Sequence, residues 1–166
     1  MRVRLTVLAV AAVVALTGCG SGARAAPEKP VVPAALAFTG RTLDGKAFDA
    51  ASLTGRPVVL WFWAPWCATC AGEAQSISDL APKYQDKVNF VGIAGMGGEK
   101  EMKEFVSDYE VGMIPQVSDN AGAVWRKFKV AEQSTYVLLN RKGDVVAKGW
   151  LDDQQITAQV AKLART

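Results

Sequence analysis

The chain has 166 residues, 50% of them hydrophobic, and its 19 Lys and Arg residues against 16 Asp and Glu give a formal net charge of +3. This length suits one domain with its own core, and a small charge without long basic runs argues against nucleic acid as a partner. The sequence contains no histidine, which excludes Ser-His and Cys-His catalytic pairs, histidine-held haem, and histidine-based zinc or copper sites.

The first 18 residues predict a lipoprotein signal peptide. Arg2 and Arg4 precede an apolar stretch, Leu5 to Leu16, that is too short to span a bilayer as a helix. It ends at Leu16-Thr17-Gly18-Cys19, which resembles the bacterial lipobox and implies cleavage before Cys19 and lipidation of its sulfur. An ordinary secretory signal is the alternative. Cleavage would leave 17 Lys and Arg against 16 Asp and Glu, so lipid rather than charge would hold the protein at the membrane.

Residues 19–35 predict the lipidated Cys19 followed by a flexible tether, because Gly, Ala and Pro dominate there. The remaining residues, 36–166, match a single domain in length. This domain is expected to begin with a hairpin, because Asp44-Gly45 separates two short extended pieces between Leu36 and Phe48.

An apolar run without alternation, Val58 to Ala64, predicts a strand buried on both faces. A helix should run from residue 67 to about 80, with Pro82 limiting its far end. Later patterns predict strands at 88–93, 115–117, 135–139 and 145–149, and helices at 99–109, 121–128 and from Asp152 to about Leu163. The predicted fold class is therefore α/β, a sheet with helices on both faces.

The most informative motif is Trp66-Cys67-Ala68-Thr69-Cys70, at the junction of the buried strand and the first helix. Thiols at i and i+3 share a helix face, so their sulfurs could meet as a disulfide or part as two thiols. Free N–H groups at the helix start would stabilise Cys67 as a thiolate. With Cys19 carrying lipid, Cys67 and Cys70 can pair only with each other. A CxxC beside a strand–helix pattern points to disulfide exchange, with a static structural disulfide as the alternative.

The segment Phe62-Trp63-Ala64-Pro65-Trp66-Cys67-x-x-Cys70 resembles the active-site segment of the thioredoxin fold in its exported, membrane-tethered version. The hairpin, an insertion around residues 94–115 and the turn at 140–144 resemble the TlpA/ResA/DsbE group, and most closely actinobacterial DsbF-like lipoproteins. The resemblance covers residues 36–166. It implies a thioredoxin-like fold, with a central mixed β-sheet flanked by helices and an N-terminal β-hairpin extension.

By this resemblance, Cys67 is the exposed attacking or attacked sulfur and Cys70 is the resolving one. The resemblance also implies a client groove and residues that shape the site, with Thr69 tuning the Cys67 thiolate by hydrogen bonding. The groove residues are Trp66, Gln133 and Ser134, and the shaping residues are Pro65 and Thr69.

Glu73 and Ser134 are two further positions at which the resemblance suggests a role in the site. Glu73 stands where the group commonly has an acid, and it could relay a proton from Cys70; an exposed helical glutamate is the alternative. Ser134 stands where the family places a cis-proline facing the cysteines. A cis bond before serine costs about 3–4 kcal/mol, so a trans loop of a different shape is expected here.

The resemblance implies an extracytoplasmic thiol–disulfide oxidoreductase that needs no cofactor or metal and is anchored to the outer face of the cell membrane through Cys19. Its clients would be exported proteins with cysteines. Oxidation of clients is the first expectation, with a membrane redox partner of the DsbB or vitamin-K-epoxide-reductase type. Reduction of client disulfides, as in cytochrome c maturation, is the alternative.

Two other classes fit the sequence less well. A peroxiredoxin would need a Thr/Ser-x-x-Cys arrangement, and the residue three positions before Cys67 is Ala64. A metal-delivery lipoprotein of the copper-chaperone kind normally adds a histidine to its cysteines.

Overall fold

The computed structural model describes residues 31–166. The predicted signal peptide, Cys19 and most of the predicted tether lie outside these residues. Between residues 31 and 166, no helix combines the length and the apolar character that a membrane crossing requires. The first element is a short 3-10 helix, η1 (Ala34–Leu36), whose Leu36 side chain is buried.

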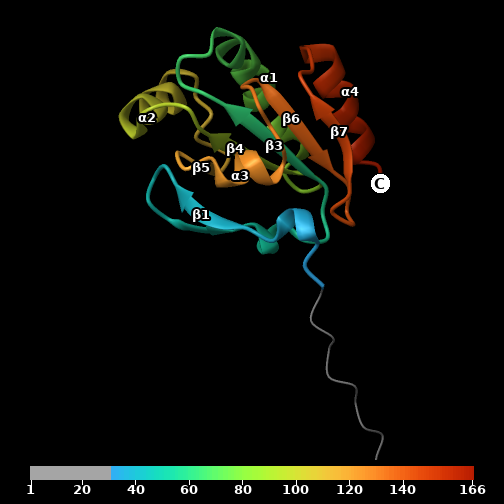
Figure 1. The fold of residues 1–166 in the computed structure, drawn as a ribbon. Helices are drawn as coiled ribbons and strands as arrows, with labels where there is room; N and C mark the ends of the chain where they lie inside the picture. Colours follow the sequence, from blue (N-terminus) through green and yellow to red (C-terminus); the bar gives the residue numbers. More distant parts are fainter. Residues whose placement is uncertain (1–30) are drawn as a thin grey trace, which may run out of the picture.

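The strands of the described residues form one seven-stranded sheet in the order β2-β1-β5-β4-β3-β6-β7 (Figure 1). β3 pairs in parallel with β4 and antiparallel with β6, so the sheet is mixed, as the resemblance implies. Every predicted strand is present. The bounds are β1 (Thr39–Thr42), β2 (Ala47–Asp49), β3 (Val58–Trp63), β4 (Asn89–Ala94), β5 (Gln116–Ser118), β6 (Thr135–Leu139) and β7 (Val145–Gly149).

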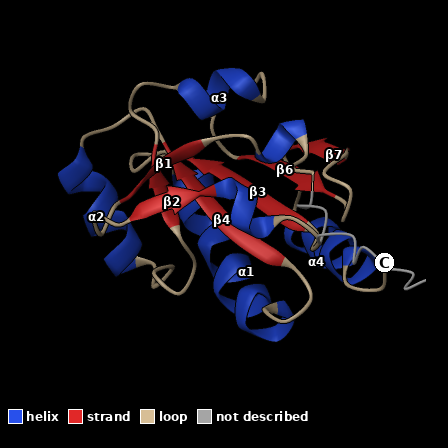
Figure 2. Cartoon of the chain, turned by 90° about the horizontal axis from the view of Figure 1, so that it is seen from below, coloured by secondary structure: helices blue, strands red, loops and turns tan. Residues whose placement is uncertain are grey.

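Helices cover both faces of the sheet, which confirms that prediction. In Figure 2, α1 and α4 lie side by side on one face and α3 lies on the other. α4 starts with a capping box at Asp152, whose carboxylate accepts from the Gln155 N–H at 2.8 Å. The bounds are α1 (Ala68–Tyr84), α2 (Glu99–Asp108), α3 (Ala123–Lys127) and α4 (Asp153–Leu163).

The predicted end of α1 near residue 80 is wrong, because the helix continues through Pro82 to Tyr84. Proline lacks an N–H and forfeits one helical hydrogen bond, here in the last turn, where few further bonds depend on it. Leu80 and Ala81 are each only 4% exposed and pack into the core beside this turn. Their burial outweighs the local preference of proline to end the helix.

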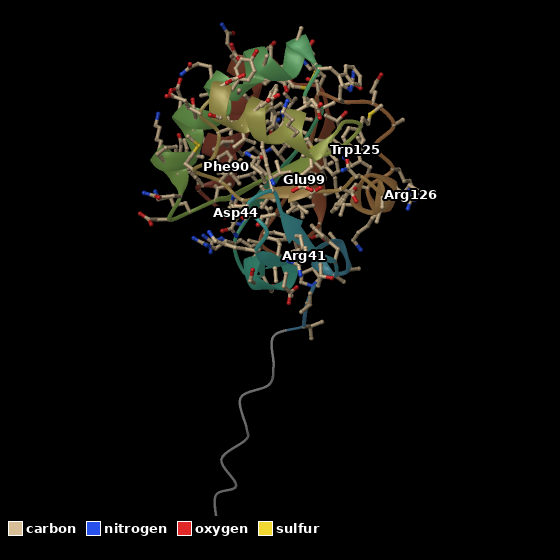
Figure 3. All side chains as sticks on the ribbon, turned by 90° about the vertical axis from the view of Figure 1, so that its left-hand side faces the viewer. Arg41, Asp44, Phe90, Glu99, Trp125 and Arg126 are labelled. Atoms are coloured by element: carbon tan, nitrogen blue, oxygen red, sulfur yellow. A yellow bond between two sulfur atoms is a disulfide. The ribbon has the colours of Figure 1, made fainter. Side chains whose placement is uncertain are left out.

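The predicted N-terminal hairpin is confirmed and extends the sheet at one edge. β1 pairs antiparallel with β2, and Gly45 takes the positive φ of 83° that the tight turn requires. β1 also pairs antiparallel with β5, which joins the hairpin to the sheet. Figure 3 shows Asp44 of the hairpin and Glu99 of α2 on the same side of the molecule.

β3 lies inside the sheet, and all six of its side chains are buried. Alternate side chains face opposite sides, so the strand contributes to two separate cores. Trp61 and Trp63 pack into the core under α1, whereas Leu60 and Phe62 pack into the core that contains α3. The continuous apolar run therefore reflects burial on both faces, as predicted, and its C-terminal end leads into the cysteine motif.

Candidate active site

The loop from β3 to α1 places Cys67 at the N-terminus of α1. Cys67 is the N-cap residue with an extended backbone, and its Sγ accepts from the Cys70 N–H at 3.0 Å. Its carbonyl accepts from the Ala71 N–H at 3.1 Å. The sulfur therefore lies at the positive end of the helix dipole, next to helix N–H groups without helical partners.

Cys67 and Cys70 are joined by a disulfide, with their Cα atoms 5.3 Å apart. Cys67 is 5% exposed and Cys70 is 0% exposed. Both cysteines are therefore buried, and the expectation of an exposed Cys67 sulfur is not met in this disulfide-bonded state; Cys67 is the one of the two that retains some exposed surface. When the bond breaks, Cys70 is the sulfur that is left inside the protein.

Glu73 lies one helical turn after Cys70 on the same side of α1, and it is buried, with 5% of its surface exposed. The alternative of an exposed helical glutamate is therefore wrong. Glu73 Oε2 accepts from Trp61 Nε1–H at 2.8 Å, and Oε1 accepts from the Ser134 hydroxyl at 2.5 Å. One carboxylate thus connects three elements beneath the disulfide: α1, β3 and the residue before β6.

Burial raises the pKa of Glu73 above its ordinary value, because removal from water disfavours the charged form. The hydrogen bonds from Ser134 and Trp61 act in the opposite direction, and the nearby Asp153 carboxylate raises the pKa further. The net direction is upward, so Glu73 holds a proton at higher pH than an exposed glutamate does. This is the property that a proton donor or acceptor beside a buried thiol needs.

Ser134 takes a backbone conformation that proline cannot adopt. No peptide bond among the described residues is cis, and Ser134 has a φ of 64°. Proline is confined to a φ near −65°. The Ser134 N–H also donates to the Phe62 carbonyl at 3.1 Å, a bond that proline would lose. The loop is therefore trans, as the missing proline predicts, and the serine adds a hydrogen bond to Glu73.

A groove of about 650 Å³ lies beside the cysteine motif. Gln133 and Ser134 line it, together with Thr69 from between the two cysteines. Trp66, which the resemblance also places in the client groove, does not line this groove. Its ring is 59% exposed and its Nε1–H donates to the Met96 carbonyl at 2.6 Å.

The two residues expected to shape the site differ in what they contact. Pro65 packs against the loop after β4 so closely that a Cβ added at Gly97 would lie 2.4 Å from Pro65 Cγ. Thr69 is exposed and lines the groove. In this disulfide-bonded state, no hydrogen bond joins its hydroxyl to Cys67, among the contacts of the described residues. The expected tuning by Thr69 is therefore not seen here.

Two exposed apolar residues beside the site were missed from the sequence. Trp150, 58% exposed, lines the groove after β7, and Met96, 51% exposed, lies next to Trp66. A large apolar residue in a loop, as Trp150 is between β7 and α4, is a signal that could have identified the first. Met96 has no such signal, because its place beside Trp66 depends on the packing of the loop after β4.

No grouping of three or more His, Cys, Asp or Glu side chains within residues 31–166 is arranged to hold a metal ion. The site brings together the disulfide pair, the Glu73 carboxylate and the Ser134 hydroxyl.

Comparison with known proteins gives consistent likenesses. The model of the AhpC/TSA family matches residues 31–148. The soluble secreted antigen MPT53 of Mycobacterium tuberculosis is 42% identical over 108 residues, which are 65% of this chain and 61% of MPT53. The thiol-disulfide oxidoreductase ResA of Bacillus cereus is 30% identical over 112 residues, which are 67% of this chain and 64% of ResA. The matches thus span less than two thirds of the length of these curated relatives.

Among solved structures, the dsbF protein of MTB, described in mixed oxidised and reduced forms, superposes with a TM-score of 0.75. It is 42% identical, and the match covers 80% of this chain and 99% of that one. Together with the family match, this likeness confirms the predicted thioredoxin-like fold.

Proposed function

The chain belongs to the AhpC/TSA family, and from this premise we propose that it is an extracytoplasmic thiol–disulfide oxidoreductase acting on exported proteins through Cys67 and Cys70. The observation that carries the proposal is the disulfide at the N-terminus of α1, in which Cys67 retains a small exposed surface and Cys70 retains none. A relative named as a thiol-disulfide oxidoreductase, ResA, and the likeness to dsbF support the same activity.

The exchange proceeds through a mixed disulfide. A client thiolate attacks Cys67 Sγ, the Cys67–Cys70 bond breaks, and its electron pair goes to Cys70. A second client thiolate then attacks the client sulfur and releases Cys67 as a thiolate, which the helix N-terminus stabilises. The client gains a disulfide and the protein gains two electrons. The same steps in reverse reduce a client disulfide.

Glu73 is proposed to give a proton to the Cys70 thiolate when the disulfide opens, and to take it back when the bond reforms. Cys70 is fully buried, so its thiolate has no water to stabilise it. Glu73 is the buried acid one helical turn away, and its pKa is raised by burial. In the proposed role, Glu73 is the group of the protein that delivers the neutralising proton to Cys70.

Oxidation of clients is the proposed direction, because the sequence resembles the DsbF-like group. A membrane enzyme of the DsbB or vitamin-K-epoxide-reductase type would then reoxidise the protein, and lipid on Cys19 would hold it at the outer face of the cell membrane. Reduction of client disulfides is the competing direction. Neither direction requires a metal or an organic cofactor.

The exchange activity is tested with Cys70→Ala. This variant should accumulate mixed disulfides through Cys67, because the resolving thiol is gone, and these adducts are counted on non-reducing gels after acid trapping. Cys67→Ala, which keeps only the buried thiol, is the matched control and should accumulate few. Equal adduct levels in both variants would contradict the proposed roles of Cys67 and Cys70. Peroxide consumption by the wild type at the rate of a peroxidase would indicate a peroxiredoxin instead.

The direction is tested by the redox state of the pair in cells. Alkylation of free thiols after acid quenching should find Cys67 and Cys70 mostly disulfide-bonded if the protein is an oxidase. Equilibration with glutathione buffers should then give a potential nearer to about −120 mV than to about −270 mV. A mostly reduced pair with a low potential would assign the reductase direction instead.

A further inference from the structure

Ser134 links the groove to the buried carboxylate. Its side chain lines the groove together with Thr69, while its hydroxyl donates to Glu73 Oε1 at 2.5 Å. Only 5% of Ser134 is exposed, so it lies between the groove and the protein interior. A proline at this position would have no hydroxyl to make the connection.

The other hydrogen bond to Glu73 cannot conduct a proton. Trp61 Nε1–H donates to Oε2 at 2.8 Å, and an indole N–H only donates. A serine hydroxyl donates one hydrogen bond and accepts others, so it can take up a proton on one side as it releases one on the other. Of the two groups bonded to Glu73, only Ser134 can pass a proton to or from the groove.

Resting on the proposed function, we propose that the Ser134 hydroxyl shuttles the proton between a client thiol in the groove and the Glu73 carboxylate. The client thiol gives its proton to Ser134 Oγ as Ser134 gives its own to Glu73 Oε1. The client thiolate attacks Cys67 Sγ, and the electron pair of the Cys67–Cys70 bond goes to Cys70. Glu73 then protonates the Cys70 thiolate. The products are a client–Cys67 disulfide, a Cys70 thiol and a Glu73 carboxylate.

Other ionisable groups near Glu73 do not provide this path. Asp153, from the first turn of α4, accepts from the Ser76 hydroxyl at 2.6 Å. Tyr136 of β6 is coupled electrostatically to Glu73, but its buried hydroxyl makes no hydrogen bond. Burial and the neighbouring carboxylates raise the pKa of Tyr136, so it keeps its proton. Among the described residues, the hydrogen-bonded route from Glu73 leads to the groove.

Two substitutions separate proton transfer from hydrogen bonding. Ser134→Gly removes the hydroxyl and accepts the positive φ without strain. Ser134→Asn also tolerates a positive φ and offers an amide N–H to Glu73, but it cannot shuttle a proton. Ser78→Ala is the control, because it removes a hydroxyl of α1 that lies outside the groove and donates to the Gln75 carbonyl rather than to Glu73.

The measurement is the single-turnover rate at which the oxidised full-length protein reacts with a reduced dithiol peptide. At about pH 6, where the peptide thiols are protonated, the Gly and Asn variants should react roughly tenfold to a hundredfold more slowly than wild type. The gap should close at about pH 10, because the peptide is then already a thiolate. Ser78→Ala should follow the wild type across the whole range.

Two results would overturn the shuttle while leaving the exchange activity in place. One is an equal slowing at all pH values, which indicates a purely structural role, and the other is a Ser134→Asn variant as fast as the wild type at about pH 6. A wild-type protein that oxidises no dithiol peptide at any pH would instead overturn the proposed function, and the shuttle with it. The peptide assay of the wild type therefore distinguishes the two failures.

Discussion

Glu73 is subject to two opposing effects on its pKa. Burial favours the neutral acid and is the larger effect, while donors on Ser134 and Trp61 favour the carboxylate. The result is an upward shift, so the folded protein holds this proton to higher pH than the unfolded chain does. The consequence for stability is measurable, because folding and proton binding are linked.

The substitution Glu73→Gln should remove a pH dependence of stability. Between the ordinary pKa of about 4.5 and the raised folded value, the folded state binds more protons than the unfolded one, so the free energy of unfolding falls as pH rises through this window. Glutamine does not titrate, and its amide can accept from Trp61 and donate to the Ser134 oxygen. Urea unfolding of the oxidised variant should therefore lack this decline. Glu132→Gln, at an exposed position of the loop that precedes Ser134, should retain the decline.

Restoring the family's proline at Ser134 should destabilise this chain. Ser134→Pro meets a φ of 64°, which proline cannot adopt, and it removes the hydrogen bond to the Phe62 carbonyl. We expect a loss of about 3 kcal/mol or more in the free energy of unfolding. Ser134→Gly, which keeps the backbone geometry, should lose less. A proline variant as stable as the glycine variant would mean that the loop readily rebuilds around a cis bond.

Helix α1 has an exposed side, where an added side chain meets no other atoms, and an N-terminal end whose preceding segment packs against the loop after β4. Gly72 is helical and exposed, with nothing within 4 Å of an added Cβ. Before the cysteine motif, Pro65 packs directly against Gly97 of the loop after β4. This contact holds the segment before Cys67 against the loop that carries Met96.

A pair of alanine substitutions tests this difference. Gly72→Ala should raise the free energy of unfolding by about 0.5–1 kcal/mol, because alanine favours the helix. Gly97→Ala should lower it by about 1–3 kcal/mol, because its Cβ overlaps Pro65, and should alter the fluorescence of Trp66. Thermal and urea unfolding measure the first effect of each. Opposite signs are the expected result, and a neutral Gly97→Ala would contradict the close contact.

Across the whole molecule, the sheet separates the core that contains the disulfide from a second core. Trp61 and Trp63 pack with the cysteines and α1, whereas Phe62 packs edge-on against Trp125 and Phe128 on the opposite face. The two faces of β3 therefore belong to different cores, and only one of these cores contains the cysteines. A substitution on the α3 side can weaken the fold without touching the site.

Phe62→Ala should lower the free energy of unfolding by about 3–5 kcal/mol, the range for truncating a buried aromatic ring. The potential of the Cys67–Cys70 pair should stay near the wild-type value, because the cysteines lie across the sheet. Val145→Ala, at a half-exposed position of β7, is the control and should change stability by less than about 0.5 kcal/mol. A large change of potential in Phe62→Ala would show that the two cores are coupled.

Most helices and strands of the fold were predictable, because each depends on the pattern of a short stretch of sequence. The run from Val58 to Trp63, the Asp44-Gly45 turn and the Asp152 cap all lie where the local pattern places them. The end of α1 was not predictable, since the burial of Leu80 and Ala81 overrides Pro82. Local sequence patterns set the bounds of a helix or strand where its contacts are local, and tertiary packing sets them elsewhere.

The dithiol motif, its place at a strand–helix junction and the α/β order of elements could be predicted from residue spacing, because each depends on a few neighbouring residues. The burial of Glu73, its hydrogen bond from Ser134, and the contact of Trp66 with Met96 instead of the groove depend on long-range packing. Ser134 and Glu73 are 61 positions apart in the chain. Their contact exists because β3 and β6 pair beneath α1, and no pattern within either segment records that pairing.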